Sequence, residues 1–195
     1  MKSVGNLYRI ALIILVLAAG GAAQDAAAIA SQPVPGVDPV VVSEFENRVR
    51  EYTRQREAIE ATLPALSKQA TAEEIAAHKA ALLKKVLADR KGAKRGVMFS
   101  PAAEKAIRQI IAAHYAGRDS MELRKELAEA ENKTVMINVN AVYPEAAELV
   151  EMPPKLLLAL PQLPKQVRYR FVVTDLLIVD RENHLIVDHM ANALP

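Results

Sequence analysis

The region from residue 40 to residue 131 repeats apolar residues at a spacing of three and four, which is the pattern of amphipathic helices. Four helix-start signals divide it: Ser43-Glu44-Phe45-Glu46, Thr71-Ala72-Glu73-Glu74, Ser100-Pro101 and Asp119-Ser120-Met121-Glu122. The loop from Pro64 to Ala70 is short, so we expect the second helix to return antiparallel to the first. This region is therefore predicted to form a small bundle of about four helices.

The apolar stripe of the first helix has one polar interruption. Its members are Val42, Phe45, Val49, Tyr52, Ile59 and Leu63. Arg56 occupies the position between Tyr52 and Ile59 where the spacing requires an apolar residue. We interpret Arg56 as a boundary position that faces solvent or another chain.

After Asn132 the period changes from 3.6 to 2, which indicates strands. The first expected strand contains the alternating residues Val135, Ile137, Val139 and Ala141. The stretch that follows, residues 142–166, is rich in proline, which excludes long helices and long strands. We expect a Pro-rich strap laid across the core, with one or two helical turns around Lys155 to Leu160.

Three apolar runs close the chain, at residues 167–173, 176–179 and 185–187. Arg168 and Arg170 alternate with the apolar residues of the first run, and Asp180-Arg181-Glu182-Asn183 supplies turn residues between the last two. The simplest topology is a short antiparallel β-meander, which the strand around Val135 could join as a fourth member. A meander of this size needs one face covered, so we expect the strap and the helices to pack on it. The predicted fold class is α+β.

The N-terminus indicates export. Lys2 and Arg9 precede an uncharged run from Ile10 to Ala23, which has about the length of a secretory signal peptide. Cleavage is expected before Gln24, with a second site before Ser31; an uncleaved membrane anchor is the alternative. The predicted division is a signal peptide at 1–23, an Ala/Pro-rich linker at 24–39, a helical region at 40–131, and a strand, strap and meander at 132–195. We expect a periplasmic or secreted protein with no transmembrane segment after cleavage.

Composition narrows the classes of function. Removing residues 1–23 takes away two of the 25 basic residues and none of the 23 acidic ones, so the mature chain is close to neutral. This balance argues against a nucleic-acid binder, which needs an excess of Lys and Arg. The absence of cysteine excludes disulfides and thiolate chemistry. With three Phe, five Tyr and no Trp, the core is expected to be aliphatic.

Six motifs are spread along the mature chain: Glu44-Phe45 with Arg48, Ile75 with His78, Met98-Phe99-Ser100-Pro101, Pro153-Pro154 with Leu160-Pro161-Gln162-Leu163-Pro164, Tyr169-Arg170-Phe171-Val172, and Leu185-Ile186-Val187-Asp188. Together they resemble a family of uncharacterised, secreted (periplasmic) bacterial proteins. The last motifs also look like a small β module at the C-terminus of several exported envelope proteins. The resemblance implies an exported protein with N-terminal helices and a C-terminal β-hairpin module. It implies no known activity and no catalytic residues.

The sequence contains no recognisable catalytic motif. It lacks a G-x-S-x-G elbow, an H-E-x-x-H pair and a Gly-rich phosphate loop after a strand. Its paired acids Glu73-Glu74 stand at a helix start, where they favour the helix dipole. We therefore expect no enzymatic activity, no catalytic residue and no cofactor.

One candidate binding site lies near the C-terminal strands. His184 and Asp188 would share one face of a strand, and Tyr169 and Arg170 are expected nearby. These four could hold a ligand or a metal ion, although a metal would need a third ligand from Asp175 or Asp180. The alternative is that they are solvent-facing polar residues of the sheet. His78 and His114 are interpreted as boundary residues of their helices rather than as ligands.

A second candidate is the basic segment from Lys79 to Arg95, which contains a single acid, Asp89. The residues expected to face an anionic partner are Lys84, Lys85, Arg90, Lys91, Lys94 and Arg95. Such a surface could attract a membrane surface or another envelope polymer. It could instead be ordinary solvated surface, or Glu145, Glu148 and Glu151 could neutralise it within the fold.

Two hypotheses of function remain. The leading one is an exported envelope protein that acts as a non-enzymatic binding or scaffolding module through its surface. The alternative is a ligand- or metal-binding envelope stress protein with a site between the strap and the sheet. The partner and the oligomeric state stay open.

Overall fold

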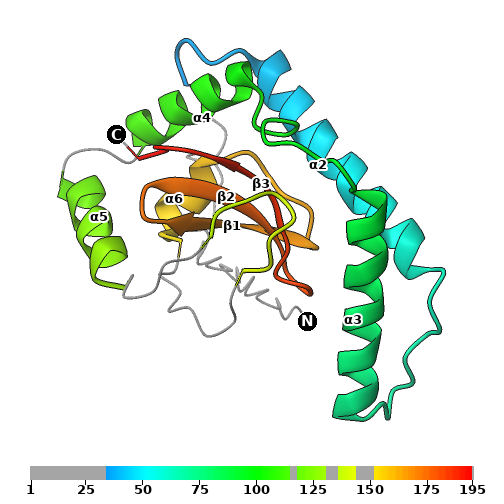
Figure 1. Ribbon diagram of the computed structural model, residues 1–195. Helices are drawn as coiled ribbons and strands as arrows, with labels where there is room; N and C mark the ends of the chain where they lie inside the picture. The colour runs from blue at the N-terminus through cyan, green and yellow to red at the C-terminus, as the bar shows by residue number, and fades with distance from the viewer. Residues whose placement is uncertain (1–33, 115–117, 131–135, 144–151, 195) are drawn as a thin grey trace, which may run out of the picture. The chain divides into compact units, whose positions relative to one another are not determined.

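Residues 34–114, 118–130, 136–143 and 152–194 are described by the structure, which is a computed structural model (Figure 1). Contacts divide the chain into Met1–Ser31 and Gln32–Pro195, and the described residues all belong to the second unit. The predicted signal peptide and most of the predicted linker therefore lie outside the described residues.

The described part has an α+β fold, as predicted. Its helices are α2 (Pro39–Glu60), α3 (Ala72–Asp89), α4 (Pro101–His114), α5 (Arg118–Ala130) and the short α6 (Pro154–Ala159). Its strands are β1 (Val167–Val172), β2 (Asp175–Asp180) and β3 (Ile186–Met190), which form an antiparallel sheet in the order β1-β2-β3. The predicted meander is confirmed. α6 confirms the helical turns that were predicted within the Pro-rich strap.

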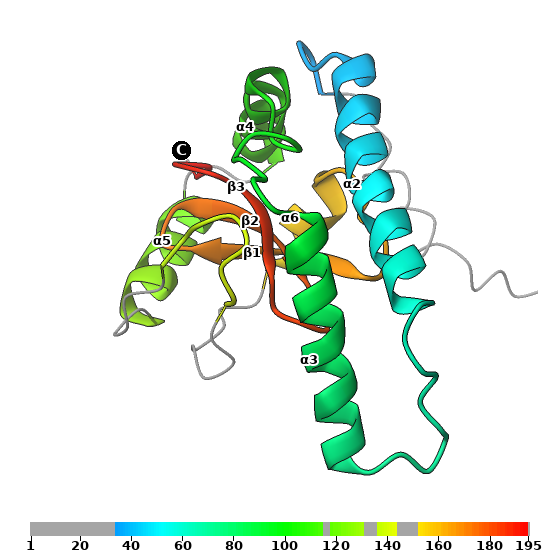
Figure 2. The ribbon, with the colours of Figure 1, turned by 45° about the vertical axis from the view of Figure 1, so that its right-hand side comes forward.

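The starts of α2 and α3 follow from local chemistry, and α3 begins at its predicted signal. Thr71 accepts a hydrogen bond from the Glu74 amide at 3.2 Å, and the Glu74 carboxylate accepts one from the Thr71 amide at 2.7 Å. The start of α2 differs from the capping-box position at Ser43. Asp38 is its N-cap, because the Asp38 carboxylate accepts from the Val40 amide at 2.8 Å and Pro39 opens the helix. α2 and α3 then form the predicted αα-hairpin (Figure 2).

The helices and the sheet share one main core. On one face of the sheet, Tyr169, Ile178 and Val187 pack in the same cluster as side chains from all five helices. On the other face, a smaller cluster contains Val172, Leu177, Val179, Ile186 and Tyr143. Residues 136–143 run across this second face (Figure 1). Both faces of the sheet are thus covered, which explains how three short strands can be stable.

The strand predicted around Val135 is not formed in residues 136–143. Val139 and Asn140 form a turn, in which Asn140 has a φ of 68°. The segment instead makes a single antiparallel bridge, Val142 to Leu185. The turn interrupts the alternating pattern, so residues 136–141 are not the regular strand that was predicted, and Val135 lies outside the described residues. Residues 140–143 nevertheless pair with the start of β3, because the Asn140 and Tyr143 amides donate to the Ile186 and His184 carbonyls at 2.9 and 2.7 Å.

β3 contains one extra residue. Ile178 pairs with Asp188 and Val179 pairs with Ile186, so Val187 has no partner of its own on β2. This β-bulge shifts the alternation of β3 by one residue. Asp188 is thereby placed on the face of the sheet that carries Ile178 and Tyr169.

Candidate functional site

A groove lies between the strap and β1, and two of the four predicted ligand residues, Tyr169 and Arg170, line it. Its volume is about 310 Å³. The apolar part of its lining consists of Met152, Leu157, Leu158, Pro161, Leu163 and Pro164. The basic part of the lining consists of Lys165, Arg168, Arg170 and Arg181. We call this site the strap groove.

The strap is held against the sheet by β1. Tyr169 points to the main core, where it is 2% exposed, and its hydroxyl donates a hydrogen bond to the Pro161 carbonyl at 2.9 Å. Burial keeps this hydroxyl protonated, because it raises the pKa of Tyr169 well above the ordinary value. Arg168 and Arg170 alternate with Tyr169 and therefore lie on the other side of the strand.

Arg181 adds a third guanidinium group to the groove. It follows β2 directly, and its backbone amide donates to the Gln166 carbonyl at 2.8 Å. Its Nε donates to the Val167 carbonyl at 3.1 Å. These two bonds fix Arg181 beside the first residue of β1, and Arg168 is the next residue along that strand.

The described lining of the strap groove contains four basic residues and no acid. Burial, and then the neighbouring guanidinium groups of Arg170 and Arg181, lowers the pKa of Arg168 below its ordinary value. Arg168 nevertheless stays protonated, because an arginine starts so far above neutral pH. Its Nε is buried, and no described residue accepts a hydrogen bond from that atom. An anion in the groove would supply such an acceptor.

The four predicted ligand residues are not brought together. Tyr169 and Arg170 line the strap groove, whereas His184 and Asp188 do not. His184 precedes β3 and has a φ of 54°, so it is not on the strand as predicted. The expectation that His184 and Asp188 share a strand face therefore does not hold, and the bulge at Val187 adds to the change of phase.

Asp188 has a structural role in the connection between α3 and α4. Its carboxylate is 1% exposed and accepts hydrogen bonds from the backbone amides of Gly96 at 3.0 Å, Met98 at 2.7 Å and Phe99 at 3.0 Å. It also accepts one from the amide of His189 at 2.8 Å. All of these donors are backbone groups, so both carboxylate oxygens are already used and the residue is not placed to bind a metal ion.

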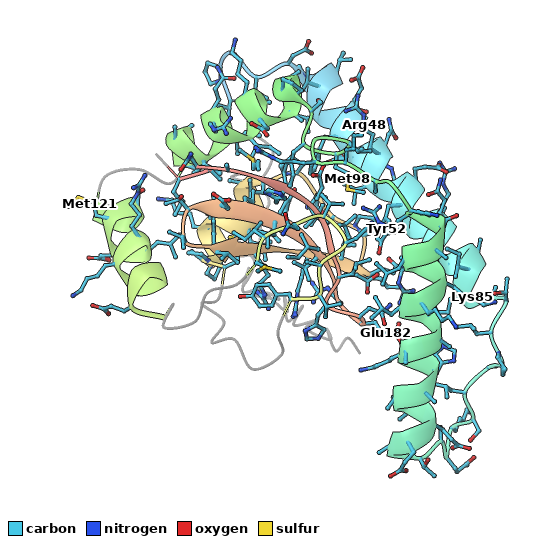
Figure 3. The ribbon with its side chains drawn as sticks, viewed as in Figure 1. Arg48, Tyr52, Lys85, Met98, Met121 and Glu182 are labelled. Atoms are coloured by element: carbon cyan, nitrogen blue, oxygen red, sulfur yellow. The ribbon has the colours of Figure 1, made fainter. Side chains whose placement is uncertain are left out.

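The basic segment divides into two groups. Arg90 and Arg95 contact the rest of the chain: Arg90 donates to the Asn140 side chain at 2.9 Å and to the Val187 carbonyl at 2.7 Å, and Arg95 donates to the His189 carbonyl at 3.1 Å. The lysines Lys84, Lys85, Lys91 and Lys94 are exposed. Lys85 donates to the Thr62 hydroxyl at 2.7 Å (Figure 3). Glu145, Glu148 and Glu151 lie outside the described residues.

Arg56 is buried, contrary to the prediction that it faces solvent or another chain. It is 4% exposed, and its Nε donates to the Asp180 carboxylate at 2.9 Å. Its other nitrogens donate to Glu60 at 2.5 Å and to Glu182. Tyr52 donates to the same Asp180 oxygen at 2.9 Å, and burial, followed by the charge of Asp180, raises the pKa of Tyr52 (Figure 3). Asp180 supplies the partner that the polar interruption in the helix requires.

Comparisons with protein-family models, with curated proteins and with solved structures give no match to this chain. Among the described helices, none combines the length and the apolar character needed to cross a membrane.

The sequence interpretation missed Arg168 and Arg181 as groove residues. A signal for Arg168 was present, because it alternates with core residues directly after the Pro-rich strap. No local signal identified Arg181 as a groove residue, because it stands in a turn and charged residues in turns are typically solvated.

Proposed function

We propose that the chain is an exported, non-enzymatic binding protein whose ligand is a small anion with an apolar part, held in the strap groove. The observation that carries this proposal is a groove lined by four basic side chains together with a set of apolar ones, without an acid in the described lining. The apolar run at residues 10–23 supports export.

The chemistry of the basic and apolar lining residues defines the ligand class. Arginine guanidinium groups bind carboxylate or phosphate oxygens through paired hydrogen bonds, and the groove presents three of them together with Lys165. Leu157 and Leu158 in the same lining are 51% and 45% exposed, so a ligand with a hydrocarbon group would cover apolar surface that now faces water. Such burial contributes roughly 25 cal/mol per Å².

The size of the groove favours a small ligand. A volume of about 310 Å³ lies at the lower end of the range of small-molecule pockets, roughly 300–1,000 Å³. An alkyl phosphate or alkyl carboxylate with a short chain fits this description. The residue types for acid–base or nucleophilic chemistry in the described lining are Lys165 and Tyr169, and the Tyr169 hydroxyl is bonded to the Pro161 carbonyl. The lining contains no described Asp, Glu, His, Cys, Ser or Thr to work with them, which supports binding rather than catalysis.

The exposed lysines of the basic segment support a scaffolding role less well. Arg90 and Arg95 are engaged in hydrogen bonds within the chain, which leaves only single lysine charges for an anionic surface. Exposed charges of this kind are screened by salt and attract partners weakly.

The test is the affinity of the protein for octyl phosphate, measured by isothermal titration calorimetry. Octanol and octyltrimethylammonium serve as ligands without the anion. We compare the wild type with Arg168→Gln, which removes a guanidinium whose Nε has no described partner, and with Leu157→Ser in the apolar part of the lining. Arg54→Gln is the matched control, because Arg54 is an exposed arginine on α2 away from the groove. The apolar N-terminal run is common to all variants and cancels in the comparison.

We expect octyl phosphate to bind to the wild type and to Arg54→Gln, with an affinity about tenfold lower for Arg168→Gln because a charge-assisted hydrogen bond is lost. Leu157→Ser should also weaken binding. Equal affinities for octyl phosphate and octanol, or an unchanged affinity in Arg168→Gln, would refute the proposal. Binding of long acidic polymers with no binding of octyl phosphate would instead support a scaffolding role.

A further inference from the structure

Three side chains that can bind metal ions meet at the end of the α2–α3 hairpin. Glu60 is the last residue of α2, His78 lies on α3, and Glu182 lies in the turn between β2 and β3. One ligand atom from each lies within 4.8 Å of the other two, and all three residues are half-buried. Figure 3 shows Glu182 at the end of the sheet next to α3. The three residues come from separate parts of the sequence, so only the fold brings them together.

The charges around this cluster favour a dication. Arg56 bonds Glu60, Glu182 and Asp180, so one positive charge faces three negative charges, and two negative charges remain uncompensated. A divalent cation would neutralise this excess. Charge balance of this kind is what a partly buried group of carboxylates requires.

Arg56 also orients the two glutamates. Its guanidinium bonds Oε2 of Glu60 and Oε2 of Glu182, and it does not bond Oε1 of either residue. Carboxylates that bind metals are commonly held in this way by a second hydrogen-bonding group. Arg56 therefore leaves each glutamate one oxygen for a metal ion and fixes the direction of that oxygen.

His78 supplies the third ligand atom and has no competing role in the described structure. It makes no hydrogen bond or ion pair with another described residue. It borders a depression of about 490 Å³ that Glu57, Leu63, Leu66 and the two glutamates also line. This depression gives water and ions access to the cluster from one side.

The ligand types indicate the class of metal. One imidazole nitrogen and two carboxylate oxygens, with an open position toward solvent, match the ligands of Zn²⁺, whereas Ca²⁺ and Mg²⁺ take oxygen ligands. Tetrahedral ligands at about 2.1 Å from zinc lie roughly 3.4 Å apart. The three ligand atoms lie within 4.8 Å of one another, so the side chains need to close by at most about 1.4 Å.

We propose that Glu60, His78 and Glu182 bind one divalent ion of the zinc class. The ion links the α2–α3 hairpin to the β2–β3 turn, next to the ion pair of Arg56 with Asp180. This site shares no residue with the strap groove, so the octyl phosphate experiment does not test the proposed metal site.

The experiment uses the full chain, treated with a chelator, dialysed and titrated with zinc chloride by calorimetry. We expect one zinc ion per chain in the wild type. His78→Ala should lower the affinity at least tenfold, because it removes one of three ligands. His114→Ala is the matched control, since His114 is a half-buried histidine on α4 outside the cluster, and it should bind zinc as the wild type does.

A second measurement is the thermal unfolding midpoint with and without zinc. Zinc should raise it in the wild type and in His114→Ala, because a ligand that binds the folded state stabilises that state, and should raise it less in His78→Ala at the same zinc concentration. If the circular dichroism spectrum of His78→Ala differs from that of the wild type, the variant has not folded correctly, and both measurements are made on Glu182→Gln instead. Its amide oxygen can still accept from Arg56, while the ligand charge is gone.

Three results would overturn the proposal. The first is the absence of saturable zinc binding to the wild type. The second is an unchanged zinc affinity in His78→Ala or, where that variant does not fold, in Glu182→Gln. The third is binding of calcium as tight as that of zinc, which would exclude the imidazole as a ligand.

Discussion

The buried carboxylate of Asp188 allows a quantitative prediction. It accepts four backbone N–H groups, and those of Met98 and Phe99 are buried while those of Gly96 and His189 are only partly buried. Asp188→Asn keeps the shape of the side chain and replaces one acceptor oxygen by an NH₂ group. Two N–H donors then face a donor instead of an acceptor.

The magnitude follows from which pair is lost. The asparagine oxygen is expected to stay with the buried amides of Met98 and Phe99, since orphaning buried donors is the more costly choice. The partly buried amides of Gly96 and His189 can recover some hydration. Each lost donor costs about 1–2 kcal/mol in this situation, which gives a total of about 2–4 kcal/mol. Asp188→Ala orphans all four donors and should cost about 5 kcal/mol or more.

The assay is urea unfolding followed by circular dichroism at neutral pH. A loss of about 3 kcal/mol should lower the midpoint by about 1–2 M urea. Asp175→Asn is the matched control in the same sheet, because Asp175 accepts a single exposed hydrogen bond, from the Asn192 amide at 3.0 Å, and should cost less than about 1 kcal/mol. Hydrogen exchange of the Gly96 amide should also accelerate in Asp188→Asn. Equal midpoints for the two variants would refute the reasoning.

Three further predictions concern stability. Arg56→Met leaves the Asp180 carboxylate, which is 0% exposed, without its cation. Urea unfolding should show a loss of about 3–5 kcal/mol in the free energy of unfolding, and the double variant with Asp180→Asn should recover much of that loss. Burial, and then the charge of Arg95, lowers the pKa of His189 in the folded chain below 6.5. The unfolded chain therefore binds more protons than the folded chain near that pH, so the free energy of unfolding should fall as the pH drops from about 8 through 6.5. Unfolding of His189→Gln, measured at about pH 8 and about pH 5, should show a smaller pH dependence than the wild type. Val173 has a φ of 54° in the β1–β2 turn, so Val173→Gly should raise the thermal midpoint by about 2–4 °C through relief of about 1 kcal/mol of strain.

The elements that the sequence predicted are those with local causes. The capping box at Thr71, the Ser100-Pro101 start of α4 and the turn after Asp180 each depend on residues within four positions of one another. Their hydrogen bonds form between neighbours in the chain, so the pattern of residue types is sufficient to recognise them.

The errors concern groups whose partners are distant in sequence. Arg56 looked like a boundary residue because its partner, Asp180, is 124 positions away. The β-bulge at Val187 has no sequence signal, yet it decides where Asp188 points. Of the four predicted ligand residues, Tyr169 and Arg170 line the strap groove and the other two do not. The cluster with His78 could not be found without knowing that α3 returns to the β2–β3 turn.

The turn between β2 and β3 connects the parts of the molecule that the two proposals concern. Asp180 begins it and closes it locally, because its Oδ1 accepts from the amides of Glu182 at 3.0 Å and Asn183 at 3.2 Å, while its Oδ2 accepts from Arg56. The next residue, Arg181, lines the strap groove, and Glu182 lies in the cluster with His78. Consecutive residues of one turn thus contribute side chains to the strap groove and to the cluster with His78. The buried Asp180 carboxylate holds the backbone of this turn, while the Val167 carbonyl positions the Arg181 side chain and Arg56 positions that of Glu182.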